Sequence, residues 1–161
     1  MNGRRAIAVL APCLCLATCE GILRAGSPGR PAVEVSVIQA TRTDGSASMD
    51  PQLPDLPAHA HEQPFLRFNT FRLLDRKQLP IEPGKPVTDP LVNGRTLQVT
   101  LLDVTDRGGE KRFHLRAAID EPGKQALLKL LEVTAGGNEP FFVGGPGFRG
   151  GTLLLEIVVR P

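Results

Sequence analysis

Two neighbouring segments of the chain alternate apolar and polar residues, and this period of two is the pattern that most constrains the fold. Residues 96–101 read TLQVTL, and residues 113–119 read FHLRAAI. Such alternation places every second side chain on one buried face of a β-strand. The sequence DRGG at 106–109 lies between the two segments and is typical of a turn. The two segments therefore predict an antiparallel hairpin.

Other parts of the chain also have strand character. Valine occupies every second position over 33–37, residues 65–74 (FLRFNTFRLL) are rich in β-favouring types, and residues 152–159 read TLLLEIVV. Asn93-Gly94 is a tight-turn dipeptide. Residues 125–133 (QALLKLLEV) fit a short helix or a strand, and the neighbouring hairpin signals favour a strand. The succession of short strands predicts an all-β fold, a small antiparallel sandwich or a partly open barrel.

The N-terminus has the pattern of a secretion signal. Arg4 and Arg5 precede an apolar run at 6–16 that is too short to span a bilayer. We therefore expect a signal peptide over 1–19, a tether over 20–31 and a β-domain over 32–161. The compact part is expected to begin near Phe65, or earlier if the strand at 33–38 pairs with it. The predicted location is the periplasm, the outer membrane as a lipoprotein, or the extracellular space.

The three cysteines of the chain all lie in this leader. Residues 16–19 (LATC) resemble the bacterial lipobox, which implies lipidation of Cys19, although Thr18 departs from the usual small residue of that motif. Ordinary cleavage near Ala17 to Cys19 is the alternative. The domain that follows has no disulfide and no thiol nucleophile, and a lipid on Cys19 would be its only attachment to a membrane.

A long stretch at 41–64 is expected to be a loop, because it holds four prolines with Ser, Asp and His and few apolar residues. Its residues His59, His61 and Glu62 are the candidate metal ligands, of types that zinc and copper accept. A Pro-rich linker does not hold ligands in a fixed geometry, so a solvated linker is the preferred interpretation. We therefore predict no metal site and no cofactor.

The charge of the chain argues against nucleic acid as a partner. The formal net charge is only +2, and basic residues are interspersed with acidic ones. Nucleic-acid binders carry a dense basic stripe. The chain also has no Trp and no Tyr, which are the usual stacking platforms for bases and sugars.

No catalytic set emerges from the motifs. Residues 145–150 match GxGxxG by letter, but a strand-like segment follows where a dinucleotide site needs a helix, so a flexible hairpin loop is predicted. His114 is expected on the polar side of its strand without a nucleophile, because all serines precede Phe65, where the compact part is expected to begin. The acids around the turns could serve a hydrolase of envelope polymers as a carboxylate pair; they are Asp103, Asp106, Glu110, Asp120 and Glu121.

The stretch from Phe65 onward resembles small exported β-domains of uncharacterised function in Gram-negative bacteria. Residues 141–145 (FFVGG) followed by 150–155 (GGTLLL) loosely resemble the closing hairpin of outer-membrane secretin domains. That likeness implies an accessory to a secretion or pilus machine. The prediction is a non-enzymatic envelope protein that binds another envelope protein through edge strands and the Gly-rich loop. An envelope-polymer hydrolase and a metal-binding periplasmic protein are the alternatives.

Overall fold

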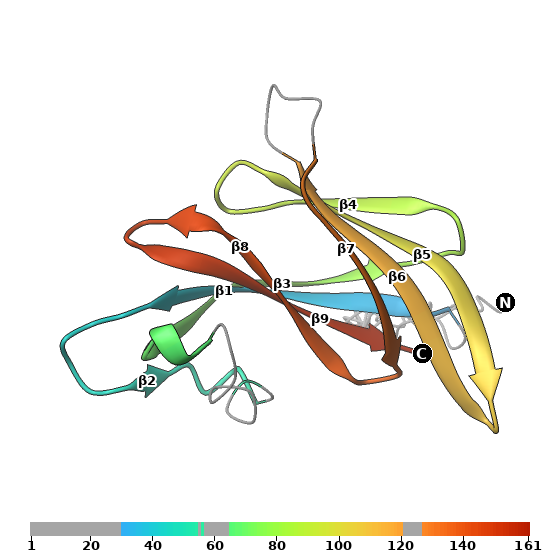
Figure 1. Ribbon diagram of the computed structural model, residues 1–161, viewed down its shortest axis with the longest axis horizontal. Helices are drawn as coiled ribbons and strands as arrows, with labels where there is room; N and C mark the ends of the chain where they lie inside the picture. Colours follow the sequence, from blue (N-terminus) through green and yellow to red (C-terminus); the bar gives the residue numbers. More distant parts are fainter. Residues whose placement is uncertain (1–29, 55, 57–64, 121–126) are drawn as a thin grey trace, which may run out of the picture.

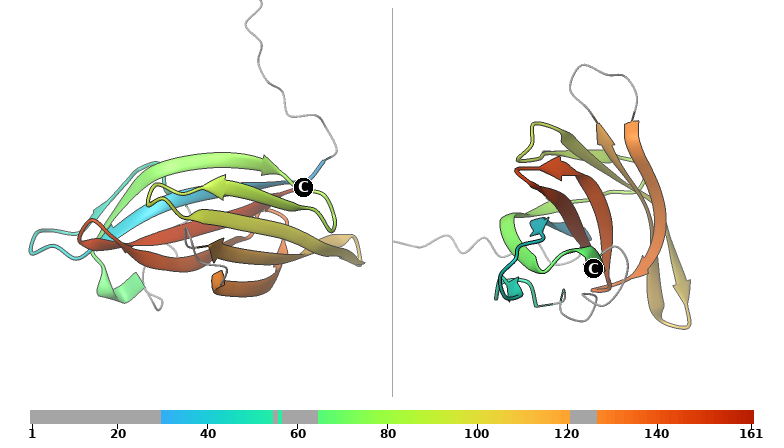
Figure 2. Two further views of the ribbon diagram at one scale, coloured as in Figure 1. Left: turned by 90° about the horizontal axis from the view of Figure 1, so that it is seen from above. Right: turned by 60° about the vertical axis from the view of Figure 1, so that its left-hand side comes forward.

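The protein is an all-β sandwich, as the alternation predicted. The computed structural model describes residues 30–54, 56, 65–120 and 127–161. Two sheets pack face to face, and neither closes into a barrel (Figures 1 and 2). The described strands are β1 (Ala32–Thr41), β2 (Ser48–Met49), β3 (Thr70–Pro80), β4 (Pro86–Pro90), β5 (Thr96–Arg107), β6 (Glu110–Asp120), β7 (Leu127–Gly136), β8 (Pro140–Phe148) and β9 (Gly151–Arg160). A short 3₁₀ helix, η1 (Phe65–Arg67), precedes β3.

The first sheet has the strand order β2-β3-β1-β9-β8, and the second has the order β4-β5-β6-β7. In the first sheet, β1 runs antiparallel to both β3 and β9. The strand predicted at 33–38 therefore lies at the centre of the fold, well before Phe65. Both faces of β1 and β9 are covered, so each of these strands is buried over most of its length.

The main core lies between the two sheets. The predicted period of two is confirmed, because alternate residues of the central strands enter this core. In the first sheet they include Val33, Val35, Val37, Leu153, Leu155, Ile157 and Val159. In the second sheet they include Leu97, Val99, Leu101, Phe113, Leu115, Ala117 and Ile119.

The predicted hairpin is formed by β5 and β6. Leu97 lies opposite Ile119, and Leu101 lies opposite Leu115. Gly108 and Gly109 at its tip have φ values of 67° and 89°, a left-handed conformation that glycine adopts without strain. The ambiguous segment at 125–133 also follows the strand prediction, since β7 pairs along β6 from residue 127 onward.

The stretch at 41–64 is not a loop throughout, and the expectation that it buries little is wrong for its first part. β2 pairs with β3, and the Asp50 amide donates to the Phe71 carbonyl at 2.9 Å. Leu53 and Leu56 are fully buried in a second apolar cluster on the outer face of the first sheet. Burial of the two leucines and backbone pairing to β3 thus offset the entropic cost of ordering this segment. The composition by itself had suggested that this cost would keep the segment disordered.

Candidate protein-interaction site

The two long flanks of the sandwich, where the edges of its sheets face each other, differ in how they are closed. At the flank between β3 and β4, the Lys77 ammonium donates to Asp89 Oδ1 at 2.8 Å and lies 3.2 Å from Asp75 Oδ2. The hydrogen bond to Asp89, followed by that to Asp75, raises the pKa of Lys77. Asp89 is buried at the edge of the second sheet, so this ion pair bridges the two sheets.

Proline also protects the β3–β4 flank. Pro86 and Pro90 begin and end β4, which is an edge strand of the second sheet. Proline has no backbone N–H to offer to another strand. Prolines and inward-pointing charges are two of the devices by which edge strands avoid pairing with other chains. The edge strand β4 is therefore poorly suited to accept a partner strand.

The opposite flank, between β7 and β8, lacks such a closure in the described part of the chain. β7 ends the second sheet and β8 ends the first, and a turn at 137–139 joins the two strands (Figure 1). Leu79 of β3 and Val87 of β4 pack against the main core and are only partly buried at the first flank. At the β7–β8 flank the same holds for Leu131, Val133 and Phe141. Apolar side chains of the interior therefore reach solvent along this flank.

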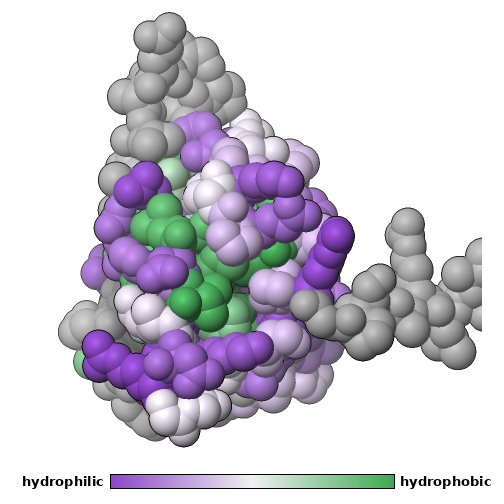
Figure 3. Space-filling model, turned by 90° about the vertical axis from the view of Figure 1, so that its right-hand side faces the viewer, coloured by the Kyte–Doolittle hydropathy of each residue, from purple (hydrophilic) through white to green (hydrophobic). Residues whose placement is uncertain are grey.

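Apolar surface is also visible at one end of the sandwich. Figure 3 looks at the end that carries the tip of the β5–β6 hairpin and the C-terminus, and it shows apolar residues surrounded by polar ones. From residue 103 to the hairpin tip, β5 is exposed, because the hairpin extends past the body of the sandwich. Val104 lies opposite the buried Phe113 and is 38% exposed.

The outer face of the second sheet carries a shallow polar hollow of about 460 Å³. Its described lining combines acids, arginines and threonines, namely Asp103, Thr105, Arg107, Glu110, Arg112, His114 and Thr134. Arg112 forms ion pairs with Glu110 and Glu139 at 3.2 and 3.3 Å. His114 lies on this polar face, as predicted, with its Nε2 3.8 Å from Glu132 Oε2.

The predicted turn acids are positioned by backbone hydrogen bonds. Asp106 Oδ1 accepts from the Gly109 amide at 2.8 Å, and Asp103 Oδ1 accepts from the Val104 amide at 2.8 Å. Glu110 lies opposite Arg107, four residues along β5 from Asp103. The carboxylates of Asp103 and Glu110 both line the polar hollow, but Asp103 accepts from the Val104 amide and Glu110 pairs with Arg112. The hydrolase alternative gains no support from these positions. Asp120 ends β6, and Glu121 lies outside the described residues.

The glycine-rich stretch at 145–150 is largely strand, so the prediction of a flexible hairpin loop is wrong. β8 continues through a bulge between Gly144 and Gly147, and only Arg149 and Gly150 form the turn to β9. A Cβ at Gly145 would lie 3.0 Å from the Leu153 carbonyl oxygen, so glycine serves close packing of the strands here. A strand follows the motif where a dinucleotide site requires a helix.

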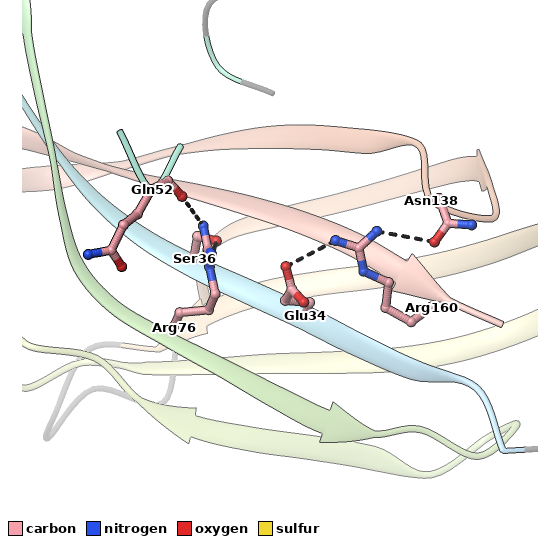
Figure 4. Close-up of polar contacts among 6 residues, drawn as sticks. All are labelled: Glu34, Ser36, Gln52, Arg76, Asn138 and Arg160. Atoms are coloured by element: carbon pink, nitrogen blue, oxygen red, sulfur yellow. Dashed lines mark hydrogen bonds and ion pairs between the residues drawn. The ribbon is translucent and has the colours of Figure 1, made fainter. Parts of the chain in front are cut away.

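The expectation that every serine precedes the compact part is also wrong. Ser36 lies in β1 and is buried, and its Oγ accepts a hydrogen bond from Arg76 Nε at 3.1 Å (Figure 4). Arg76 also donates to the Gln52 carbonyl at 2.6 Å and so ties the segment after β2 to the sheet. On the same face, Arg160 contacts Glu34 and Asn138, each at 3.1 Å. These contacts hold the sheet and its covering segment together.

The remaining predicted site residues lie outside the described residues. They are the lipidation candidate Cys19 and the metal-ligand candidates His59, His61 and Glu62. Among the residues that are described, no group of three or more His, Cys, Asp or Glu is arranged to hold a metal ion. The same residues contain no helix of the length and apolarity needed to cross a membrane.

Comparison with known proteins gives no family for this chain. It matches no protein-family model, no curated protein and no solved structure. The β7–β8 flank is therefore the candidate site on structural grounds alone, because its edge strand β7 carries no proline and no ion pair among the described residues joins β7 to β8.

Proposed function

We propose that the protein is a non-enzymatic binding module of the cell envelope, and that a partner protein adds an extended segment to the edge of β7. In this mode of recognition, backbone hydrogen bonds to an edge strand supply affinity, and alternate side chains supply specificity. β7 has β6 as its one strand partner among the described residues. A strand added to β7 would cover Leu131 and Val133 and extend the second sheet.

The observation that carries this proposal is the difference between the two flanks. Partly buried core side chains occur at both flanks, but Lys77, Asp89 and the prolines of β4 close one of them. At the other flank β7 carries no proline, and no ion pair among the described residues joins it to β8. Burial of apolar surface favours association by about 25 cal/mol per Å² before the cost of ordering the partner. Leu131 and Val133 would therefore add affinity beside an edge strand whose backbone, unlike that of β4, is not interrupted by proline.

Site-specific photo-crosslinking in cells tests the location of the interface. Thr134 on β7 and Thr88 on β4 are both exposed threonines on edge strands, so they form a matched pair of positions. We expect benzoylphenylalanine at position 134 to give one discrete adduct, and the same residue at position 88 to give none. Mass spectrometry of the adduct should locate the cross-link within an extended segment of the partner.

Two outcomes would contradict the proposal. One is equal adduct formation from the two positions, which would indicate nonspecific contact. The other is no adduct from position 134 while the protein is folded and present at its normal level, because a partner strand on β7 would lie against this side chain.

We further propose that the protein acts outside the cytoplasm. The support is the leader pattern at 1–19, in which a basic pair precedes a short apolar run. Intact mass measurement of the protein purified from cells distinguishes the possible locations. A diacylglyceryl adduct on Cys19 would identify a membrane-anchored lipoprotein, and a cut near Ala17 to Cys19 without a lipid would identify a soluble exported protein. Retention of the whole leader would overturn the proposal.

A further inference from the structure

The chemistry of the segment that β7 accepts can be inferred from the charges beside its edge. On the outer face of the second sheet, Arg116 of β6 lies opposite Glu132 of β7. Both Nε and Nη2 of Arg116 donate to Glu132 Oε1, at 2.9 and 2.6 Å. The other carboxylate oxygen, Oε2, lies 3.8 Å from His114 Nε2, which is beyond hydrogen-bond distance. Glu132 is therefore held in place with one oxygen left to accept from another donor.

A strand added to β7 would place one of its side chains directly opposite Glu132. Directly opposite residues have Cβ atoms about 4.5–5.5 Å apart, and opposite charges at such positions stabilise a sheet whereas like charges destabilise it. The neighbouring residues of the added strand would lie opposite Leu131 and Val133, which belong to the core between the sheets. We propose that the segment bound by β7 carries a basic residue opposite Glu132 with an apolar residue on each side of it. This inference rests on the proposed function.

A second copy of this chain does not supply such a segment through its own β7. When identical strands pair antiparallel in one sheet, the twofold axis is perpendicular to the sheet and maps each face of the sheet onto itself. Directly opposite side chains then lie on the same face. Glu132 would then lie opposite a residue an even number of positions away. These residues are Leu128, Leu130, Thr134, Gly136 and Glu132 itself, and none is basic. The segment bound by β7 is therefore not the β7 strand of a second copy.

Two synthetic peptides test the inference on the full chain. The first is the capped peptide Thr-Val-Thr-Val-Lys-Val-Thr-Val-Thr, and the second has Glu in place of Lys. We expect titration calorimetry at low salt to show about 3- to 10-fold tighter binding of the Lys peptide, from the cross-strand charge pair. The preference should shrink as salt is added. The Lys peptide should also suppress the cross-link from position 134.

A charge exchange provides the matched control. The double variant Arg116→Glu with Glu132→Arg retains an acid–base pair between β6 and β7 while reversing the charge at the edge, and it should prefer the Glu peptide. An unchanged preference in a folded double variant would overturn the inference.

The remaining outcomes separate this inference from the proposed function. If both peptides bind equally and both suppress the cross-link, the charge inference fails and strand addition at β7 stands. If neither peptide binds, the inference fails again, and the cross-link from position 134 decides the proposed function by itself.

Discussion

Gly151 begins β9 beside the backbone of β1, and its lack of a side chain is required there. A Cβ at this position would lie 2.5 Å from the Ala40 carbonyl oxygen and from Thr41 Cγ2. Non-bonded carbon and oxygen atoms do not approach so closely, so one of the two central strands must shift.

We expect Gly151→Ala to lower the free energy of unfolding by about 1–3 kcal/mol, the usual cost of overpacking. Gly45→Ala is the matched control, because the nearest atom to its added Cβ is Thr43 Oγ1 at 3.9 Å, an ordinary contact. Urea unfolding followed by circular dichroism measures both variants. Equal stabilities would show that β1 and β9 are not held at the observed distance.

Lys77 neutralises a buried carboxylate, and its loss should destabilise the protein. Lys77→Met leaves Asp89 buried without its cation. Because the Lys77 side chain is 38% exposed and solvent screens part of the pair, we expect a loss of about 1–2 kcal/mol, below the range for fully buried pairs. Lys85→Gln is the control, since its pair with Glu82 is exposed and should contribute little. A loss no larger for Lys77→Met than for Lys85→Gln would contradict the closure of this flank.

The pH dependence of the same pair follows from the raised pKa of Lys77. A cation whose pKa is higher in the folded state stabilises the fold fully below its ordinary pKa, 10.5 for lysine, and loses that contribution as the pH rises through the folded value. We therefore expect the stability difference between the native protein and Lys77→Met to be constant between pH 7 and 9. It should shrink above about pH 10.5 in unfolding titrations. A difference that grows at alkaline pH would contradict this assignment.

At the scale of elements, the segment around β2 shows how packing overrides composition. In this segment, Asp50 Oδ2 accepts a hydrogen bond from the Leu73 amide at 3.2 Å, and the Leu53 side chain is only 1% exposed. Its prolines and polar residues suggested a solvated loop because local composition does not reveal which apolar face lies nearby. That face is the outer side of the first sheet, formed by strands distant in the sequence.

We expect Leu53→Ala to cost about 2–4 kcal/mol, as for other buried leucines. Leu66→Ala removes the same atoms from a side chain that is 51% exposed and should change stability by less than about 0.5 kcal/mol. Thermal or urea unfolding measures both. If the two variants are equally stable, the segment does not form part of the cooperative fold.

At the scale of the whole molecule, one core joins both sheets, so the sandwich should unfold as a unit. Leu115 of the second sheet and Ile157 of the first lie in the same apolar cluster. We expect Leu115→Ala and Ile157→Val each to lower the protection of amide hydrogens in both sheets, because global unfolding exposes them together. Hydrogen exchange read by mass spectrometry, peptide by peptide, checks this. Loss of protection confined to the mutated sheet would show two independent units.

The sequence by itself determined the strands and the sharpest turns. The period of two over 96–101 and 113–119 and the glycines at 108 and 109 are local signals, because a strand's buried face and a positive φ depend on neighbouring residues. They were sufficient for the all-β fold and the β5–β6 hairpin. They could not show which strands become edges, because strand partners lie far apart in the chain.

Only the tertiary structure decided the centre of the fold and the candidate site. Ala32 lies opposite Arg160 of β9 and opposite Pro80 of β3, so β1 has a neighbour on each side within its sheet. The sequence pattern of β1 would fit any half-buried strand. Lys77 and Asp89 meet across two sheets, and Leu131 and Val133 are partly exposed because β7 ends its sheet. The alternation of apolar and polar residues along a strand determines which face of the sheet each side chain occupies. The neighbours of that side chain depend on the strand order, which long-range packing selects.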